Sequence, residues 1–122
     1  MKQILFFDSY AIMEIFRGNE SYLKFKKVIP VITKLNLFEI YYNVLWQVGK
    51  KEAEELFGEY LPYVVEFNNE DIKRASHLKA RFRRQKISMT DCIGYVIAER
   101  LEIMFLTGDK EFKNFRNVVF VK

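Results

Sequence analysis

The sequence predicts an α/β protein of three layers, with helices on both faces of a central, mostly parallel sheet of five strands. Short apolar runs alternate with longer segments whose apolar residues recur at helical spacing, which is typical of a parallel sheet covered by helices. The first run, residues 4–7, is apolar at every position and is followed by Asp8. This is the pattern of a strand that is buried on both faces and stops at a polar edge.

The predicted elements follow in order along the chain. In the first half we expect a strand at 4–7, helices at 9–16 and 20–28, a strand at 30–33, and helices at 35–48 and 50–60. Gly18 suits a left-handed cap after the first helix, Gly49 ends the third, and Pro62 stops the fourth.

The second half repeats the alternation. We expect a strand at 63–67, a helix at 70–84, a helix at 91–101, a strand at 103–106, a short helical turn ending near 112, and a strand at 118–121. The helix at 91–101 is apolar almost all round, so it should be buried.

Length and composition limit the class of protein. The chain has 122 residues, and we expect residues 1–122 to form a single domain with its own core. The apolar N-terminal run is too short for a signal peptide, and no run of 18 apolar residues suggests a membrane span. The single cysteine, Cys92, excludes an internal disulfide and fits a reducing compartment, so we expect a cytoplasmic protein.

Four acids occupy related places in this pattern. Asp8 follows the first strand, Asp109 follows the fourth, Asp91 opens the buried helix, and Glu39 lies one turn inside the helix after the second strand. Because open α/β folds bind ligands at the carboxyl edge of the sheet, the four should converge there. Clustered carboxylates repel one another unless cations lie between them, and hard oxygen ligands favour Mg²⁺ or Mn²⁺.

Each acid also has an ordinary structural explanation. Asp8 can cap the first helix, although Ser9 could take over that role. Asp91 can be the third position of a capping box that begins at Ser88, and Asp109 can be a turn residue.

Glu39 can belong to a partly exposed helix face. Against that reading, its helix carries no Lys between Lys34 and Lys50, and uncharged polar residues surround the carboxylate instead. We interpret this stripe, formed by Asn36, Asn43 and Gln47, as the wall of a polar cleft.

The net charge of the chain gives little information about its function. The formal charge is +4, and without the four acids the surface would carry 20 basic and 12 acidic side chains. A basic surface around an acidic pocket suits a polyanion, but the net charge alone is explained equally well by solubility.

Four pieces of sequence, in this order and spacing, cover nearly the whole chain. They are Phe7-Asp8-Ser9 with a following helix that ends at Arg17-Gly18, Leu37-Phe38-Glu39, residues 88–93, and residues 106–112. Together they resemble PIN-domain ribonucleases, most of all the toxin subunits of VapBC toxin–antitoxin systems.

The resemblance implies a metal-dependent endoribonuclease. Asp8, Glu39, Asp91 and Asp109 match the family's four acids, which would hold one or two Mg²⁺ or Mn²⁺ ions, and Thr107 matches its hydroxyl position. It further implies attack of an activated water on an RNA phosphodiester, leaving a 5′-phosphate and a 3′-hydroxyl.

The resemblance also implies a homodimer and a protein antitoxin that blocks the site by filling an apolar groove. A group of aromatic residues could supply such surfaces, although we expect most of them in the core. They are Tyr41, Tyr42, Trp46, Phe57 and Tyr60.

A basic run leads from the helix at 70–84 to the segment of Asp91. Its cations, Arg81, Arg83, Arg84 and Lys86, are our candidates for contacts with RNA phosphates, but a solvated helix end explains them equally well. The only histidine, His77, lies among cations in mid-helix and is expected at the surface.

Two other functions stay open. The chain could be an inactive PIN-fold binding module. A phospho-receiver domain is the second alternative, but it would need a further acidic pair near the first strand and a Lys that ends the fifth strand on its inner face, whereas Lys122 is the chain end. A P-loop enzyme is excluded because no Gly-x-x-x-x-Gly-Lys motif is present.

Overall fold

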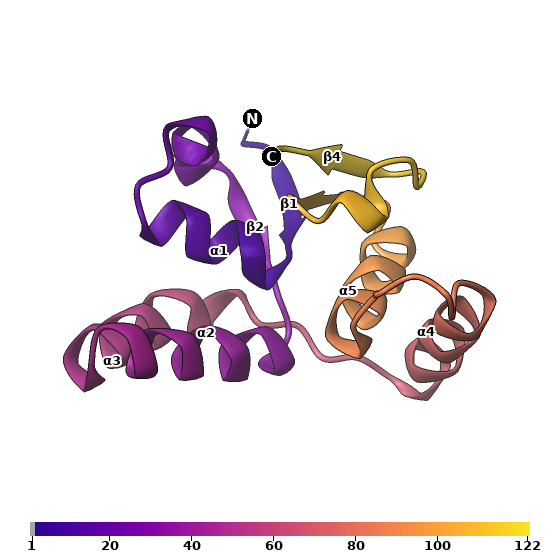
Figure 1. Ribbon diagram of the computed structural model, residues 1–122, viewed down its shortest axis with the longest axis horizontal. Coiled ribbons are helices and arrows are strands. Elements are labelled where there is room, and N and C mark those ends of the chain that lie inside the picture. The colour runs from indigo at the N-terminus through magenta and orange to yellow at the C-terminus, as the bar shows by residue number, and fades with distance from the viewer. Residues whose placement is uncertain (1) are drawn as a thin grey trace.

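The computed structural model describes residues 2–122 and contains a four-stranded sheet between two groups of helices (Figure 1). Its strands stand in the order β2-β1-β3-β4 and all pair in parallel. They are β1 (Ile4–Phe7), β2 (Ile29–Val31), β3 (Met104–Thr107) and β4 (Val118–Phe120). The three-layer α/β architecture is therefore as predicted, and the carboxyl ends of all the strands lie at one edge.

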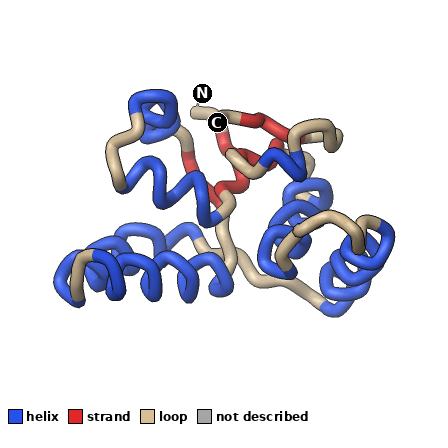
Figure 2. Tube along the Cα trace, viewed as in Figure 1, coloured by secondary structure: helices blue, strands red, loops and turns tan. Residues whose placement is uncertain are grey.

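The helices divide between the two faces of the sheet (Figure 2). One face packs against α1 (Ser9–Phe16), the 3-10 helix η1 (Glu20–Lys27), α2 (Lys34–Gln47) and α3 (Lys50–Tyr60). The other packs against α4 (Asn69–Arg81) and α5 (Met89–Arg100). Two short 3-10 helices, η2 (Leu61–Tyr63) and η3 (Lys110–Phe112), complete the elements. None of the helices in residues 2–122 has the length and apolar character needed to cross a bilayer.

The central strand β1 contributes to both halves of the core. Leu5 and Phe7 lie in the apolar cluster on the side of α1, whereas Phe6 lies in the cluster on the side of α5. Phe6 stacks on Phe105 of β3 with ring centroids 5.7 Å apart. All of these side chains are buried, so the strand is fixed from both sides and holds the next residue, Asp8, in a defined place.

The predicted fifth strand at 63–67 is wrong. Only a single parallel bridge forms there, between Ile32 and Val64. Two backbone hydrogen bonds support it: the Ile32 N–H donates to the Tyr63 carbonyl (3.2 Å) and the Val65 N–H to the Ile32 carbonyl (2.8 Å). Pro62 lies in η2, immediately before this segment, and the neighbouring β2 has only three residues. The segment therefore has no strand residues with which to form a longer ladder.

Most helix ends lie within two residues of the prediction, such as the start of α5 at Met89 instead of residue 91, but two places differ more. The segment expected as a helix at 20–28 is the 3-10 helix η1, and α4 ends at Arg81 instead of residue 84. Phe82 leaves the helical conformation and packs on Phe115, with ring centroids 4.9 Å apart. Gly18 has a positive φ of 77° after α1, as predicted, and His77 is exposed, as predicted.

Candidate functional site

Asp8 is the N-cap of α1 and is only 1% exposed. Its Oδ1 accepts a hydrogen bond from the Ala11 N–H (2.7 Å), and its Oδ2 accepts one from the Thr107 hydroxyl (2.5 Å). The expectation that Ser9 could take over the cap is therefore wrong. Because a carboxylate has about four lone-pair positions, these two bonds leave room for a further ligand on each oxygen.

Ser9 has another task, which the sequence did not reveal. Its hydroxyl donates to Oε1 of Glu39 (2.5 Å) and accepts from Nδ2 of Asn36 (3.0 Å). Asn36 is buried and completes a capping box with Thr33 at the start of α2. The first turn of α1 thus holds Glu39 beside the end of β1.

The predicted polar stripe on α2 is only partly a wall of this site. Asn36 belongs to the network, as described. Gln47, however, is exposed and accepts a hydrogen bond from Nη2 of Arg17 (3.0 Å).

Asp91 and Asp109 each lie at the start of a helix. The Ser88 hydroxyl accepts a hydrogen bond from the Asp91 N–H (3.0 Å), so Ser88 caps α5 as predicted, but the reciprocal bond of the predicted capping box, from the Ser88 N–H to the Asp91 carboxylate, is not formed. Asp109 caps η3 by accepting from the Glu111 N–H (2.9 Å), and its own N–H donates to the Thr107 hydroxyl (2.9 Å). Both side chains are half-buried.

The structure brings the four acids to one hollow of about 390 Å³. Its lining consists of Asp8, Ser9, Tyr10, Glu39, Ser88, Asp91, Gly108, Asp109, Lys110 and Lys122. Thr107 is fully buried directly behind Asp8. The two lysines were not among the predicted site residues: Lys110 adjoins Asp109 in the sequence, whereas Lys122 follows β4 and reaches the hollow because β4 lies beside β3, a strand order that the sequence does not give.

Burial and mutual repulsion shape the electrostatics of the hollow. Burial raises the pKa of Asp8 well above its usual value, and the neighbouring Asp91 and Asp109 raise it further, while the hydrogen bonds from Thr107 and Ala11 oppose the rise. Burial, Glu39 and Asp109 raise the pKa of Asp91 to about 7. Negative charge on both Asp8 and Asp91 is therefore unfavourable in this hollow without a cation.

The chemistry of the hollow fits a hard divalent cation. Within residues 2–122, no three His, Cys, Asp or Glu side chains are already arranged as a metal-binding group. The carboxylates of the hollow are nevertheless the oxygen donors that Mg²⁺ and Mn²⁺ prefer. A cation among them would relieve the repulsion that raises the pKa values of Asp8 and Asp91.

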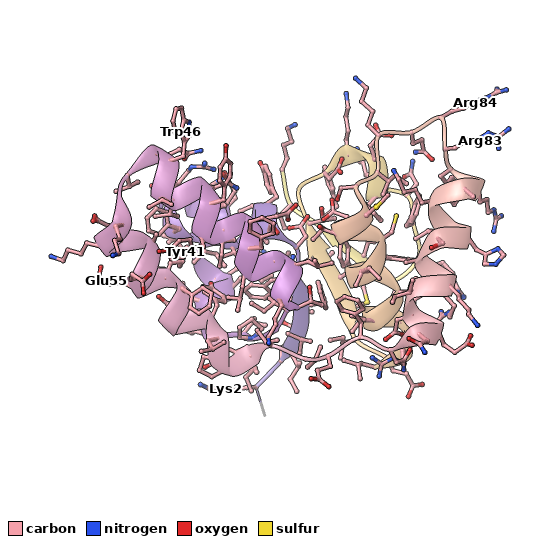
Figure 3. The ribbon with its side chains drawn as sticks, turned by 90° about the horizontal axis from the view of Figure 1, so that it is seen from below. Lys2, Tyr41, Trp46, Glu55, Arg83 and Arg84 are labelled. Atoms are coloured by element: carbon pink, nitrogen blue, oxygen red, sulfur yellow. The ribbon has the colours of Figure 1, made fainter. Side chains whose placement is uncertain are left out.

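The basic residues predicted to contact RNA lie outside this hollow. Arg81, Arg83 and Arg84 line a separate one of about 350 Å³ at the end of α4, and Lys86 is exposed. Arg83 and Arg84 extend outward beyond the end of α4 (Figure 3).

The aromatic residues expected mostly in the core divide into two groups. Tyr60 is buried, and Tyr41 and Phe57 pack against the core. Tyr42 and Trp46 are 59% and 79% exposed, so the expectation that most of the five lie in the core is confirmed by the other three. In Figure 3, Trp46 projects away from the body of the molecule at the end of α2.

Comparison with known proteins gives a family and two similar structures. The sequence profile of the PIN domain matches residues 5–118. A toxin–antitoxin complex from Klebsiella pneumoniae has a similar fold, with a TM-score of 0.73, 15% identity, and coverage of 94% of this chain and 95% of that chain. VapBC2 from Rickettsia felis, bound to a DNA fragment from its promoter, has a TM-score of 0.71, 17% identity, and coverage of 98% of both chains. No curated protein matches the sequence.

Proposed function

This chain belongs to the PIN-domain family, and on that premise we propose that it is an endoribonuclease that hydrolyses RNA phosphodiester bonds with Mg²⁺ or Mn²⁺. The observation that carries the proposal is the convergence of four acids from separate elements. Asp8 at the end of β1, Glu39 of α2, Asp91 of α5 and Asp109 before η3 line one hollow at the carboxyl edge of the sheet. Such an edge is where parallel α/β sheets bind their ligands.

In this proposal the four carboxylates hold one or two divalent ions. When bound, the ion supplies Lewis acidity towards a phosphate oxygen and makes water a better nucleophile at neutral pH. The family's reaction leaves a 5′-phosphate and a 3′-hydroxyl, and we propose the same products.

The other side chains of the hollow position these carboxylates. Thr107 holds the Oδ2 of Asp8 and, by accepting from the Asp109 N–H, fixes Asp109 at the same point. Ser9 holds Glu39 through its hydroxyl. Lys110 adds a positive charge to the lining, suited to a phosphate oxygen next to the scissile bond.

We further propose that the chain is the toxin of a toxin–antitoxin pair. The two similar solved structures are complexes of this kind, which supports the proposal by fold alone. A protein antitoxin would then restrain the nuclease, and the chain would act as a homodimer in the cytoplasm. Analytical ultracentrifugation of the purified chain gives its mass, and a mass equal to the 14.7 kDa of one chain contradicts the homodimer.

The test of the nuclease is RNA cleavage by the purified chain, shown to be free of any copurifying protein. We expect cleavage of single-stranded RNA with Mg²⁺ or Mn²⁺ and none with EDTA. If the chain binds RNA or a protein partner but leaves RNA intact with either metal, the inactive PIN-fold binding module is the correct reading.

A further inference from the structure

A row of three hollows starts at the acidic site. Beside the acidic hollow lies a second one, of about 570 Å³, between α4, α5 and η3, and Lys110 lines both. The second hollow shares Arg81, Phe82 and Gln85 with the third, the hollow of about 350 Å³ at the end of α4. The shared side chains show that each hollow adjoins the next.

Charge changes sign along this row. The first hollow has four acids and two lysines, whereas the third has Arg81, Arg83 and Arg84 and no acid. The second hollow lies between these extremes, with cations from Arg81, Lys110 and Arg116 and acids from Glu99 and Glu111.

The charge of Glu99 is already compensated. Its Oε1 lies 3.2 Å from Nη2 of Arg74, and its Oε2 lies 3.5 Å from Nη2 of Arg116. The Arg116 side chain is 89% exposed, and an ion pair so open to water contributes little to holding it in place. Arg116 can therefore turn to a phosphate at small cost, and Arg74 stays paired with Glu99.

Two partly buried aromatic rings lie among these cations. Phe82 and Phe115 line the second hollow, half-buried, with ring centroids 4.9 Å apart. The Arg81 guanidinium lies 5.4 Å from the centre of the Phe82 ring. Aromatic faces combined with a basic groove are the features that bind single-stranded nucleic acids, because bases stack on the rings and phosphates contact the cations.

We propose that this row binds the stretch of single-stranded RNA adjoining the scissile phosphate. Lys110, Arg116 and Arg81 contact its phosphates, and a base enters the second hollow against Phe82 and Phe115. The strand must be single because a base in a duplex is stacked and cannot turn into a side hollow. This inference rests on the proposed endoribonuclease function and adds the path of its substrate.

Binding of a fluorescent single-stranded RNA of about ten nucleotides, followed by anisotropy in EDTA, tests the path. We expect the double variant Arg81→Ala/Arg116→Ala to bind about tenfold more weakly than the wild type. The affinity of this variant should also depend less steeply on salt. The magnitude of the slope of log affinity against log salt concentration should decrease by about 1.4, since each phosphate contact to a single strand contributes about 0.7. The matched control, Lys26→Ala/Lys51→Ala, removes two exposed cations from elsewhere and should change neither quantity.

Equal affinity and slope for the two double variants would overturn the inference, as would tighter binding of duplex than of single-stranded RNA. Photocrosslinking with RNA that contains 5-iodouridine gives a second readout. We expect crosslinks to Phe82 or Phe115, whereas crosslinks confined to Tyr42 and Trp46 of α2 would place the RNA on another face and overturn the path. In parallel, RNA cleavage by the wild type is measured in the presence of metal. If the wild type does not cleave RNA, the proposed function is contradicted. If the wild type cleaves RNA and the Arg81→Ala/Arg116→Ala variant binds RNA with unaltered affinity, this inference alone is contradicted.

Discussion

The Thr107 hydroxyl donates a hydrogen bond to Oδ2 of Asp8 across 2.5 Å and so joins the carboxyl ends of β3 and β1. The Thr107 hydroxyl oxygen also accepts a hydrogen bond from the Asp109 N–H. One buried side chain therefore positions two of the four acids, although it carries no charge. The relationship spans 99 residues of sequence, so it depends on the parallel pairing of the two strands.

Thr107→Val tests this positioning role, because valine keeps the shape of the side chain but cannot hydrogen-bond. The buried Asp8 carboxyl loses a donor and the Asp109 N–H loses its acceptor, so we expect the free energy of unfolding to fall by about 1–3 kcal/mol. RNA cleavage should slow as well. Thr107→Ser retains the hydroxyl and should preserve more of both properties. Equal stability and equal cleavage rate in the valine variant and the wild type would refute the role.

The raised pKa of Asp91 predicts how stability depends on pH without metal. Between the ordinary carboxyl pKa of 3.8 and about 7, folded Asp91 keeps a proton that the unfolded chain releases. The free energy of unfolding should therefore decrease as the pH rises through this window, and Asp8 acts in the same direction. Thermal unfolding in EDTA at several pH values measures the effect.

Two comparisons identify the cause of this pH dependence. Asp91→Asn removes the titrating group and should flatten the profile. Mn²⁺ should raise the unfolding temperature more above pH 7 than near pH 5, because a cation binds the deprotonated carboxylates. A wild-type profile that rises with pH across this window would contradict the electrostatic description of the hollow.

Gly94→Ala tests whether close packing of α5 fixes β1. A Cβ at position 94 would lie 2.5 Å from the nearest carbon of the Phe6 ring and 3.2 Å from the Phe105 ring. Since both rings are fully buried, they cannot move away freely, and we expect a loss of about 1–3 kcal/mol in the free energy of unfolding. Gly58→Ala is the matched control: nothing lies within 4 Å of its added methyl group, and this variant should be neutral or slightly more stable. Equal unfolding temperatures in the two variants would contradict the packing argument.

Local patterns in the sequence were enough to predict much of this molecule. The apolar run of β1, the Ser88 cap of α5 and the left-handed Gly18 are local features, and the structure has all of them. The prediction that the four acids lie at the same edge of the sheet needed one further assumption, that the strands are parallel.

Local sequence patterns do not predict contacts between distant segments. The bond from Ser9 to Glu39 joins residues 30 apart, and Lys122 reaches the hollow only because β4 pairs with β3. The apolar segment near Val64 resembled a strand, but its neighbour β2 is too short to pair with it. The exposure of Trp46 likewise depends on which face of α2 packs against α3, and the pattern of this helix does not decide it.

RNA cleavage by Asp8→Asn and Asp91→Asn tests most directly whether the four acids form the metal-dependent cleavage site. Each change replaces a carboxyl group by an amide of nearly the same volume, so both variants should remain folded by circular dichroism. With Mn²⁺ or Mg²⁺ we expect each to cleave single-stranded RNA at least about a hundredfold more slowly than the wild type. Glu55→Gln, an exposed acid on α3, is the matched control and should cleave at the wild-type rate. Cleavage at the wild-type rate by both aspartate variants would contradict the assignment of the site.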